Sequence, residues 1–240
     1  MIVSEVMTTR LITITPGDTL SHAANLLRQY QFHHLPVVRT TSTFGVSEIR
    51  SGQGPVLEGL LTSQDIDVAA AVGTWSSSEL LHRPWQERRV AEVMHRAVMR
   101  VNPTTSVAAA AQMLVERGLN CLPVVEYERP EQETTSTETE PVLVGLITRS
   151  DLLMALARSL GAFEPGMQLS IPLPMGDLTP LAHTLTLAAE LHIQVRSVLA
   201  APLEGNVPLS ATLRLGTINP APLLLRLQEA NISYTFVDAQ

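Results

Sequence analysis

The amino-acid sequence predicts an α+β protein in which a β-α-β-β-α unit occurs twice and is followed by a β-α-β-β-α-β segment. The first observation behind this prediction is an internal repeat. EVM at 5–7 and LPVV at 35–38 return as EVM at 92–94 and LPVV at 122–125. The second observation is a change of pattern from about residue 167, where new strand and helix signals begin without any copy of these motifs.

A longer motif follows LPVV in both copies, as GLLTSQD at 59–65 and GLITRSD at 145–151. The offset between the copies is 87 residues up to LPVV and 86 in this motif, so the intervening loop has lost one residue. Each motif reads as an apolar strand ending in threonine, with an aspartate three residues later where a helix begins. Such turns present backbone N–H groups and the positive end of a helix dipole to a ligand. The aspartate can accept the two vicinal hydroxyls of a ribose, whereas a single copy would indicate only a helix cap.

The elements of each unit follow from the apolar spacing. First strands are expected at 11–15 and 98–101, each ended by a proline turn. The N-cap candidates of the next helices are Asp18 or Thr19, and Thr105 or Ser106. One apolar face runs along these helices, made by Leu20, Ala23, Ala24 and Leu27, and by Val107, Ala110, Ala111 and Leu114. The LPVV strand, a strand at 56–62 or 142–148, and a helix at 64–72 or 150–160 complete each unit.

The last third of the chain has a different order of elements. A strand at 167–174 precedes a helix that starts after Gly176-Asp177. Two strands, at 194–203 and 207–215, are joined by a Glu-Gly-Asn turn at 204–206. Asn219 caps a second helix with Pro220 at its start, and 232–238 forms the last strand. This is the ferredoxin-like split βαβ order.

Two long loops and a linker interrupt this pattern. The loops at 39–55 and 126–141 are poor in apolar residues, and we expect them to be mobile excursions. The second carries six glutamates against one arginine, which suits either a cation or partner site or a solvated loop. The linker at 74–89 holds both tryptophans, which we expect to pack on the surface of the units.

Composition excludes several classes of function. A net charge of −7 argues against nucleic-acid binding driven by phosphate neutralisation. The chain has no lysine, which excludes a Schiff-base lysine and a lysine-dependent phosphate loop. No apolar run approaches the roughly 18 residues that span a bilayer. The lone cysteine, Cys121, excludes an internal disulfide and fits a reducing compartment, so we expect a cytoplasmic protein.

The first 165 residues resemble a tandem pair of CBS domains, the regulatory unit called a Bateman module. The residues that carry the resemblance are the EVM before the first strand, the capped helix, LPVV, and the Gly-x-x-Thr-x-x-Asp motif. The last third resembles an ACT domain through its element order and the turn at Gly176 and Leu178, and the layout is similar to acetoin-utilisation-type CBS–ACT proteins. The domains expected from this are 1–73 and 90–165 for the CBS units, 74–89 for the linker, and 166–240 for the ACT-like domain.

The resemblance implies that the two CBS units pack about a pseudo-twofold axis and leave two clefts for adenosine ligands. By this resemblance, Asp65 and Asp151 hold ribose hydroxyls, and Thr62 and Thr148 contact ribose or phosphate. The pairs before LPVV, His33-His34 and Asn120-Cys121, reach towards phosphate from the opposite unit, which makes the clefts unequal. Which cleft receives the histidines is left open. The remaining expected site residues flank the adenine or lie in the motifs themselves: Ile12, Pro36, Leu60, Met99, Pro123, Leu146 and Arg149.

Each of these residues also has a simpler interpretation. Asp65 and Asp151 can be helix caps only, His33 and His34 can lie at a strand edge, and Cys121 can be a small core residue. Arg149 suits either a phosphate contact or a solvated helix start. If it binds phosphate, we expect the Asp151 cleft to favour the more phosphorylated ligand.

The leading functional hypothesis is a regulatory sensor of AMP-, ADP- or ATP-type ligands, with a possible amino-acid input at the ACT-like domain. No HExxH, GxSxG, CxxC or phosphate-loop pattern occurs, so we expect no enzyme, no metal site and no obligatory cofactor. The competing hypotheses are a structural dimerisation module with empty clefts and an enzyme with an unrecognised site. A homodimer is expected by resemblance, and the exposed edges and apolar face of the C-terminal sheet are compatible with it. The adenosine ligand, the regulated partner and the pathway are not encoded in any motif.

Overall fold

The fold is taken from a computed structural model of the full chain. It describes residues 1–39, 54–75, 84–128, 140–200, 202, 207–217 and 219–236. Most of the expected excursions at 39–55 and 126–141, half of the linker at 74–89 and the turn at 204–206 lie outside these residues. The chain divides into two compact units, Met1–Leu152 and Leu153–Gln240, which are described separately.

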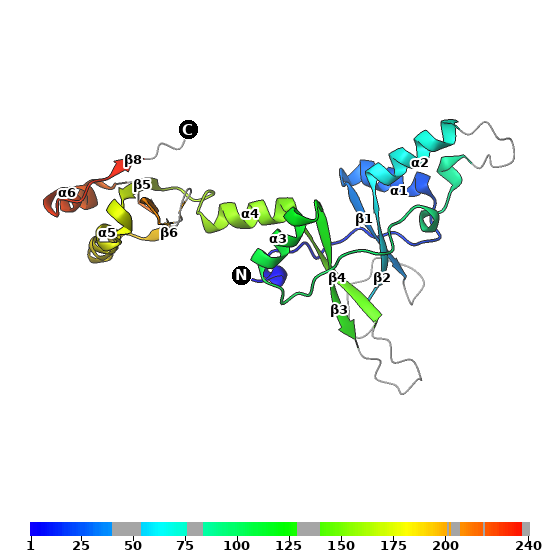
Figure 1. The fold of residues 1–240 in the computed structure, drawn as a ribbon, viewed down its shortest axis with the longest axis horizontal. Coiled ribbons are helices and arrows are strands. Elements are labelled where there is room, and N and C mark those ends of the chain that lie inside the picture. The colour runs from blue at the N-terminus through cyan, green and yellow to red at the C-terminus, as the bar shows by residue number, and fades with distance from the viewer. Residues whose placement is uncertain are drawn as a thin grey trace. The chain divides into compact units, whose positions relative to one another are not determined.

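Both units contain helices and strands (Figure 1). The α-helices are α1 (Leu20–Tyr30), α2 (Ser63–Trp75), α3 (Val107–Glu116), α4 (Arg149–Ser159), α5 (Thr179–Glu190) and α6 (Ala221–Glu229). The strands are β1 (His34–Arg39), β2 (Val56–Thr62), β3 (Cys121–Glu128), β4 (Glu140–Thr148), β5 (Met167–Pro172), β6 (Val195–Leu199), β7 (Ser210–Leu215) and β8 (Thr235–Phe236). Short 3-10 turns occur at η1 (Val3–Glu5), η2 (Trp85–Glu87), η3 (Val90–Glu92) and η4 (Pro174–Gly176). None of these described helices is both long and apolar enough to cross a membrane.

The helix starts follow the side chains expected to cap them. Thr19 accepts a hydrogen bond from the backbone of His22 at the start of α1, and Ser106 accepts one from Ala109 at the start of α3. Asn219 accepts a bond from the Ala221 backbone at the start of α6. The capping predictions for these three residues are therefore confirmed.

The first unit contains one antiparallel sheet of order β1-β2-β4-β3. Each repeat supplies a hairpin, β1 with β2 and β3 with β4. The hairpins meet where Val56 of β2 pairs with Val142 of β4. A small cluster of buried side chains covers this junction, made by Val38, Leu57, Val125 and Leu143.

The expected first strand of each repeat is reduced to a single parallel bridge. Ile14 donates to the Pro36 carbonyl at 3.1 Å and accepts from Val38 at 2.9 Å. The next bond of a parallel ladder needs the N–H of Pro36 on one side and of Pro16 on the other, and proline has none. The second repeat has the same arrangement at Val101, Pro123, Val125 and Pro103. The prolines therefore limit these strands, and the β-α-β-β-α prediction overestimated their length.

The segments that precede the repeats cross over. Residues 2–8 pack on the second repeat, where the Val3 backbone donates to Thr105 at 2.8 Å. Figure 1 shows this dark blue N-terminal segment beside α3. Residues 84–95 pack on the first repeat, where Val90 donates to Asp18 at 2.9 Å. Val3 and Val90 are each fully buried in the core of the repeat that they join, so each repeat is completed by the other repeat's leading segment.

Each repeat has its own apolar core. In the first, Trp85 from the linker packs against the cluster that contains Leu20, Leu35 and Leu61. The corresponding second cluster contains Leu114 and Leu122. The side chain of Trp75, the other tryptophan, lies outside the described part of the chain.

The second unit has an antiparallel sheet of order β6-β7-β5-β8 and the element order β-α-β-β-α-β. Leu169, Ile171 and Leu213 lie on the face that is buried with side chains of α5 and α6. The alternate positions of β5 and β7 point to the opposite face and are polar: Gln168, Ser170, Thr212 and Arg214. The expectation of an apolar sheet face available for dimerisation was therefore wrong, because the helices cover it.

Candidate nucleotide cleft

The two Thr-x-x-Asp turns have almost the same hydrogen bonds. In the first, the backbone N–H and the hydroxyl of Thr62 donate to Oδ2 of Asp65 at 2.8 and 2.7 Å, and the Asp65 N–H donates back to the threonine hydroxyl at 3.2 Å. In the second, the same three bonds join Thr148 and Asp151 at 2.8, 2.7 and 3.1 Å. One carboxylate oxygen of each aspartate is thus committed to starting α2 or α4. The helix-cap role is present in both copies, and only Oδ1 remains to meet a ligand.

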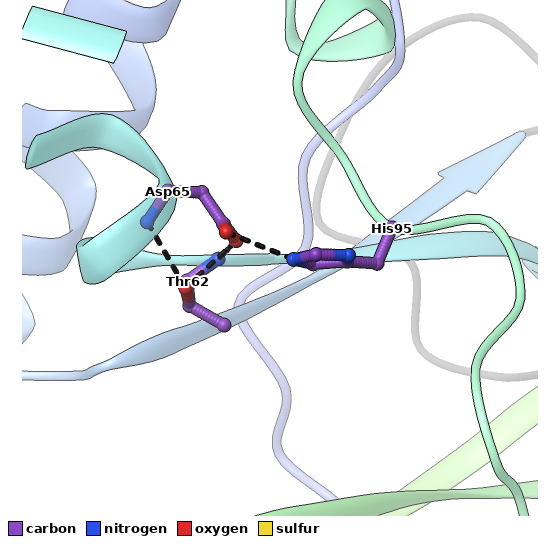
Figure 2. Close-up of polar contacts among 3 residues, drawn as sticks. All are labelled: Thr62, Asp65 and His95. Carbon is purple, nitrogen blue, oxygen red and sulfur yellow. Dashed lines mark hydrogen bonds and ion pairs between the residues drawn. The ribbon is translucent and has the colours of Figure 1, made fainter. Parts of the chain in front are cut away.

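The two Oδ1 atoms differ in their partner. Oδ1 of Asp151 accepts a long hydrogen bond of 3.4 Å from the Thr8 hydroxyl. Oδ1 of Asp65 lies 2.8 Å from Nε2 of His95. Figure 2 shows the Asp65 carboxylate between Thr62 and the His95 ring. Thr8 and His95 follow the EVM of each repeat, so they are equivalent positions with different chemistry.

A cleft of about 640 Å³ opens at the Asp151 turn. Its lining comes from both repeats: Thr8, Arg10, Leu11, Ile12, Gln31, Phe32, His33, His34, Pro36, Asn120, Leu146, Thr148, Arg149, Ser150 and Asp151. Nine of these were expected as site residues from the sequence: Ile12, His33, His34, Pro36, Asn120, Leu146, Thr148, Arg149 and Asp151. The volume lies in the usual range of small-molecule sites. The structure also answers the question left open by the sequence, since His33 and His34 line the cleft of Asp151.

The other six expected residues do not line this cleft: Leu60, Thr62, Asp65, Met99, Cys121 and Pro123. Cys121 is 4% exposed, and burial raises the pKa of its thiol to about 12. It therefore stays a neutral core residue at physiological pH, as its simpler interpretation held, and cannot provide an accessible contact to phosphate.

Four basic side chains give the Asp151 cleft its electrostatic character. Arg10 is exposed, and within the described ranges no acceptor contacts its guanidinium. Arg149 is anchored, since its Nε donates to the Leu119 carbonyl at 2.7 Å and its Nη2 to the Leu114 carbonyl at 3.3 Å. Arg149 is also exposed at the first residue of α4 and lines the cleft, so the phosphate contact and the solvated helix start both stay predictions. The other two basic groups are His33 and His34.

The two histidines are not equally exposed. His33 is exposed, whereas His34 is half-buried at the start of β1. Burial lowers the pKa of His34, the neighbouring His33 lowers it further, and the Asp65 carboxylate partly opposes this. His34 is therefore biased towards the neutral form, and an anion placed beside it would favour its protonation.

The two arginines of the Asp151 cleft have no counterpart in the other copy of their motifs. The residues equivalent to Arg10 and Arg149 are Ala97 and Ser63. The expected inequality of the two turns is therefore a difference in permanent charge. No three histidine, cysteine, aspartate or glutamate side chains gather into a metal site in the part of the chain that the structure describes.

Several lining residues were missed by the sequence prediction, namely Thr8, Arg10, Leu11, Gln31, Phe32 and Ser150. Thr8 and Arg10 follow the first EVM, and they reach the Asp151 turn only because this segment crosses to the second repeat. The repeat alignment did contain one signal, since it places His95 opposite Thr8 and Ala97 opposite Arg10.

The comparisons with known proteins agree with this arrangement of two repeats. The family model of the CBS domain matches residues 3–69 and 90–158, which is more than half of the chain. The CBS domain-containing protein YhcV of Bacillus subtilis is 29% identical over 150 residues, covering 62% of this chain and 81% of YhcV. The L-aspartate semialdehyde sulfurtransferase of Methanosarcina acetivorans is 27% identical over 157 residues, and the match covers 65% of this chain and 24% of that enzyme.

Solved structures were also compared. A Vibrio cholerae protein named AcuB, for acetoin utilization, is 26% identical with a TM-score of 0.48, covering 69% of this chain and 98% of that one. CBSX2, crystallised in complex with AMP, is 20% identical with a TM-score of 0.47, covering 65% and 95%.

The duplicated hairpin units with capped Thr-x-x-Asp turns define a protein with a paired-repeat module. On the family match, the chain belongs to the CBS-domain family and carries a tandem CBS pair.

Proposed function

We propose that this chain is a regulatory sensor that binds an adenosine phosphate in the Asp151 cleft. The observation that carries the proposal is the lining of this cleft, which combines a carboxylate oxygen held only by a long hydrogen bond, apolar side chains and basic groups in one space of about 640 Å³. These are the three chemistries needed for a ribose, an adenine ring and phosphate.

Each part of the ligand has a matching group. Oδ1 of Asp151 accepts ribose hydroxyls in place of its long contact with Thr8. Ile12 and Leu146 offer apolar surface to the adenine. Phosphate meets Arg10, the two histidines and the N-terminus of α4, where the helix dipole favours negative charge.

Ligand binding between the repeats provides a route to regulation. The cleft takes residues from both hairpins, which join in the sheet through the pair of Val56 with Val142 and the bond from the Leu143 N–H to the Pro55 carbonyl. A ligand that prefers one relative arrangement of the hairpins shifts the population towards it. The regulated partner is a protein that distinguishes the two arrangements, and no catalytic step is needed.

A thermal-shift panel with AMP, ADP, ATP, S-adenosylmethionine and NAD tests this function. A ligand present at 100 times its dissociation constant adds about 2.7 kcal/mol to the free energy of unfolding. The informative variant is Asp151→Asn, because an amide oxygen still caps α4 while the negative charge at the ribose is lost. Asp67→Asn, on the exposed face of α2, is the matched control. The proposal fails if none of these compounds raises the melting temperature, and turnover of any of them would indicate an enzyme instead.

We further propose that residues 166–240 form a ferredoxin-like ACT-like domain, after CBS units at 1–73 and 90–165 and a linker at 74–89. Its support is the strand order β6-β7-β5-β8 together with the turn at Gly176, whose φ is +79°. An amino-acid input and a homodimer belong to this proposal. An amino-acid panel on the full chain, followed by light scattering with and without the ligand found, tests both.

A further inference from the structure

The segments that carry Thr8 and His95 are fixed to the two repeats in the same way. The backbone of His95 exchanges two hydrogen bonds of 2.9 Å with Leu60, and the backbone of Thr8 exchanges two of 2.9 Å with Leu146. Leu60 and Leu146 each lie two residues before the threonine of a Thr-x-x-Asp turn. Each crossing segment therefore places one side chain at Oδ1 of an aspartate, the oxygen that does not take part in the helix cap.

The delivered side chains leave the two aspartates in different states. Thr8 reaches Asp151 only at 3.4 Å, so that Oδ1 remains available to a stronger donor. His95 lies at 2.8 Å from Oδ1 of Asp65, and Thr62 already holds Oδ2 at 2.7 Å. Both oxygens of Asp65 thus have a partner within the chain.

Exposure indicates which group covers the other. The Asp65 side chain is 16% exposed, whereas the His95 side chain is 64% exposed. The imidazole therefore lies on the solvent side of the carboxylate, where a ribose would approach. A ribose hydroxyl must displace this contact before it can bind.

We propose that His95 closes the Asp65 turn to ribose, so that only one of the two Thr-x-x-Asp turns, the one at Asp151, binds a nucleotide. The residue after each EVM thereby decides which of the two turns is open. This inference rests on the proposed function, since it names the stoichiometry and the site of the same ligand. Displacing a charge-assisted hydrogen bond weakens binding by about 10- to 100-fold.

The test exchanges the two side chains and counts ligands by isothermal titration calorimetry. Adenosine is used beside ATP, because Ala97 and Ser63 stand in the first Thr-x-x-Asp copy where the Asp151 cleft has Arg10 and Arg149. The wild-type chain should bind one equivalent. Thr8→His should weaken binding at Asp151 by about 10- to 100-fold, and His95→Thr should add a second equivalent of adenosine. That second equivalent should be lost again when Asp65→Asn is added to His95→Thr.

Three results would overturn the inference: two equivalents bound by the wild type, unchanged affinity in Thr8→His, or no added site in His95→Thr. Both positions are exposed, and melting temperatures without ligand report whether the variants fold. A wild type that binds no adenosine compound refutes the proposed function but not the closure. In that case the His95→Thr variant alone tests the closure. Adenosine binding by this variant supports the closure, and a variant that binds no adenosine refutes it.

Discussion

Replacing Arg10 by alanine removes a cationic side chain in the Asp151 cleft that no acceptor holds among the described residues. Two unit charges 4 Å apart interact by about 1 kcal/mol in water and about 4 kcal/mol at the effective dielectric near a protein surface. Because Arg10 is exposed, we expect the lower part of this range, about 1–2 kcal/mol, which corresponds to about 5- to 30-fold in affinity for ATP. Adenosine has no phosphate, so its affinity should not change.

Calorimetric titrations of ATP and adenosine at two salt concentrations measure both effects. The loss for ATP should shrink at high salt, since exposed charges are screened. Arg226→Ala is the control, because it removes the same charge from α6, which contributes no residue to the lining of the cleft. The electrostatic reasoning is refuted if Arg10→Ala weakens ATP and adenosine equally, or if Arg226→Ala has the same effect on ATP.

Three other predictions concern pH, packing and reactivity. Burial lowers the pKa of His34, so the unfolded chain takes up this proton at a higher pH than the folded chain, and the ligand-free stability should fall as pH drops from about 7.5 to about 5.5. ATP should bind more tightly as the pH drops over the same window, because its phosphates favour the protonated ring. His34→Gln should flatten the pH dependence of stability, measured by urea unfolding, and that of ATP affinity, measured by calorimetry. A wild-type stability that rises on acidification would contradict this. Gly59→Ala would bring a Cβ atom within 2.6 Å of the backbone carbonyl oxygen of His95, and it should lower the free energy of unfolding in urea by about 1–3 kcal/mol. Gly145→Ala should cost less, because its new atom meets a flexible methionine side chain. Equal costs for the two variants would contradict this reasoning. Cys121, with its thiol pKa raised to about 12, should resist iodoacetamide at about pH 8 until the protein unfolds, and rapid labelling of the folded chain would show that it is accessible.

Much of the fold could be predicted because the repeat supplied each signal twice. The caps at Thr19 and Ser106 and the two Thr-x-x-Asp turns depend on local hydrogen bonds, which residue type and spacing determine. The length of the first strands was overestimated because it depends on residues in another part of the chain. The apolar run around Ile14 looks like a strand, but the length of its ladder depends on the missing N–H group of Pro36 in another strand.

The candidate site was predictable where its residues belong to the repeated motifs or to the strands beside them. Thr148 and Asp151 belong to the motif, whereas Arg10 reaches them through the crossing of the N-terminal segment. A repeat alignment shows that two positions are equivalent, but not which half of the molecule each segment joins. The contact between His95 and Asp65 was missed for the same reason.

The crossing of the leading segments also constrains how the chain folds during its synthesis. The core of the first repeat is incomplete until Val90 and Met94 have left the ribosome, although its own hairpin ends at Thr62. The N-terminal segment waits longer, because Val3 packs against Ile147 of the second hairpin. The nascent chain must therefore keep an apolar N-terminus unburied while more than half of the protein is made, which is the period when aggregation competes with folding. Neither repeat is a self-sufficient folding unit, and the pair should fold as one.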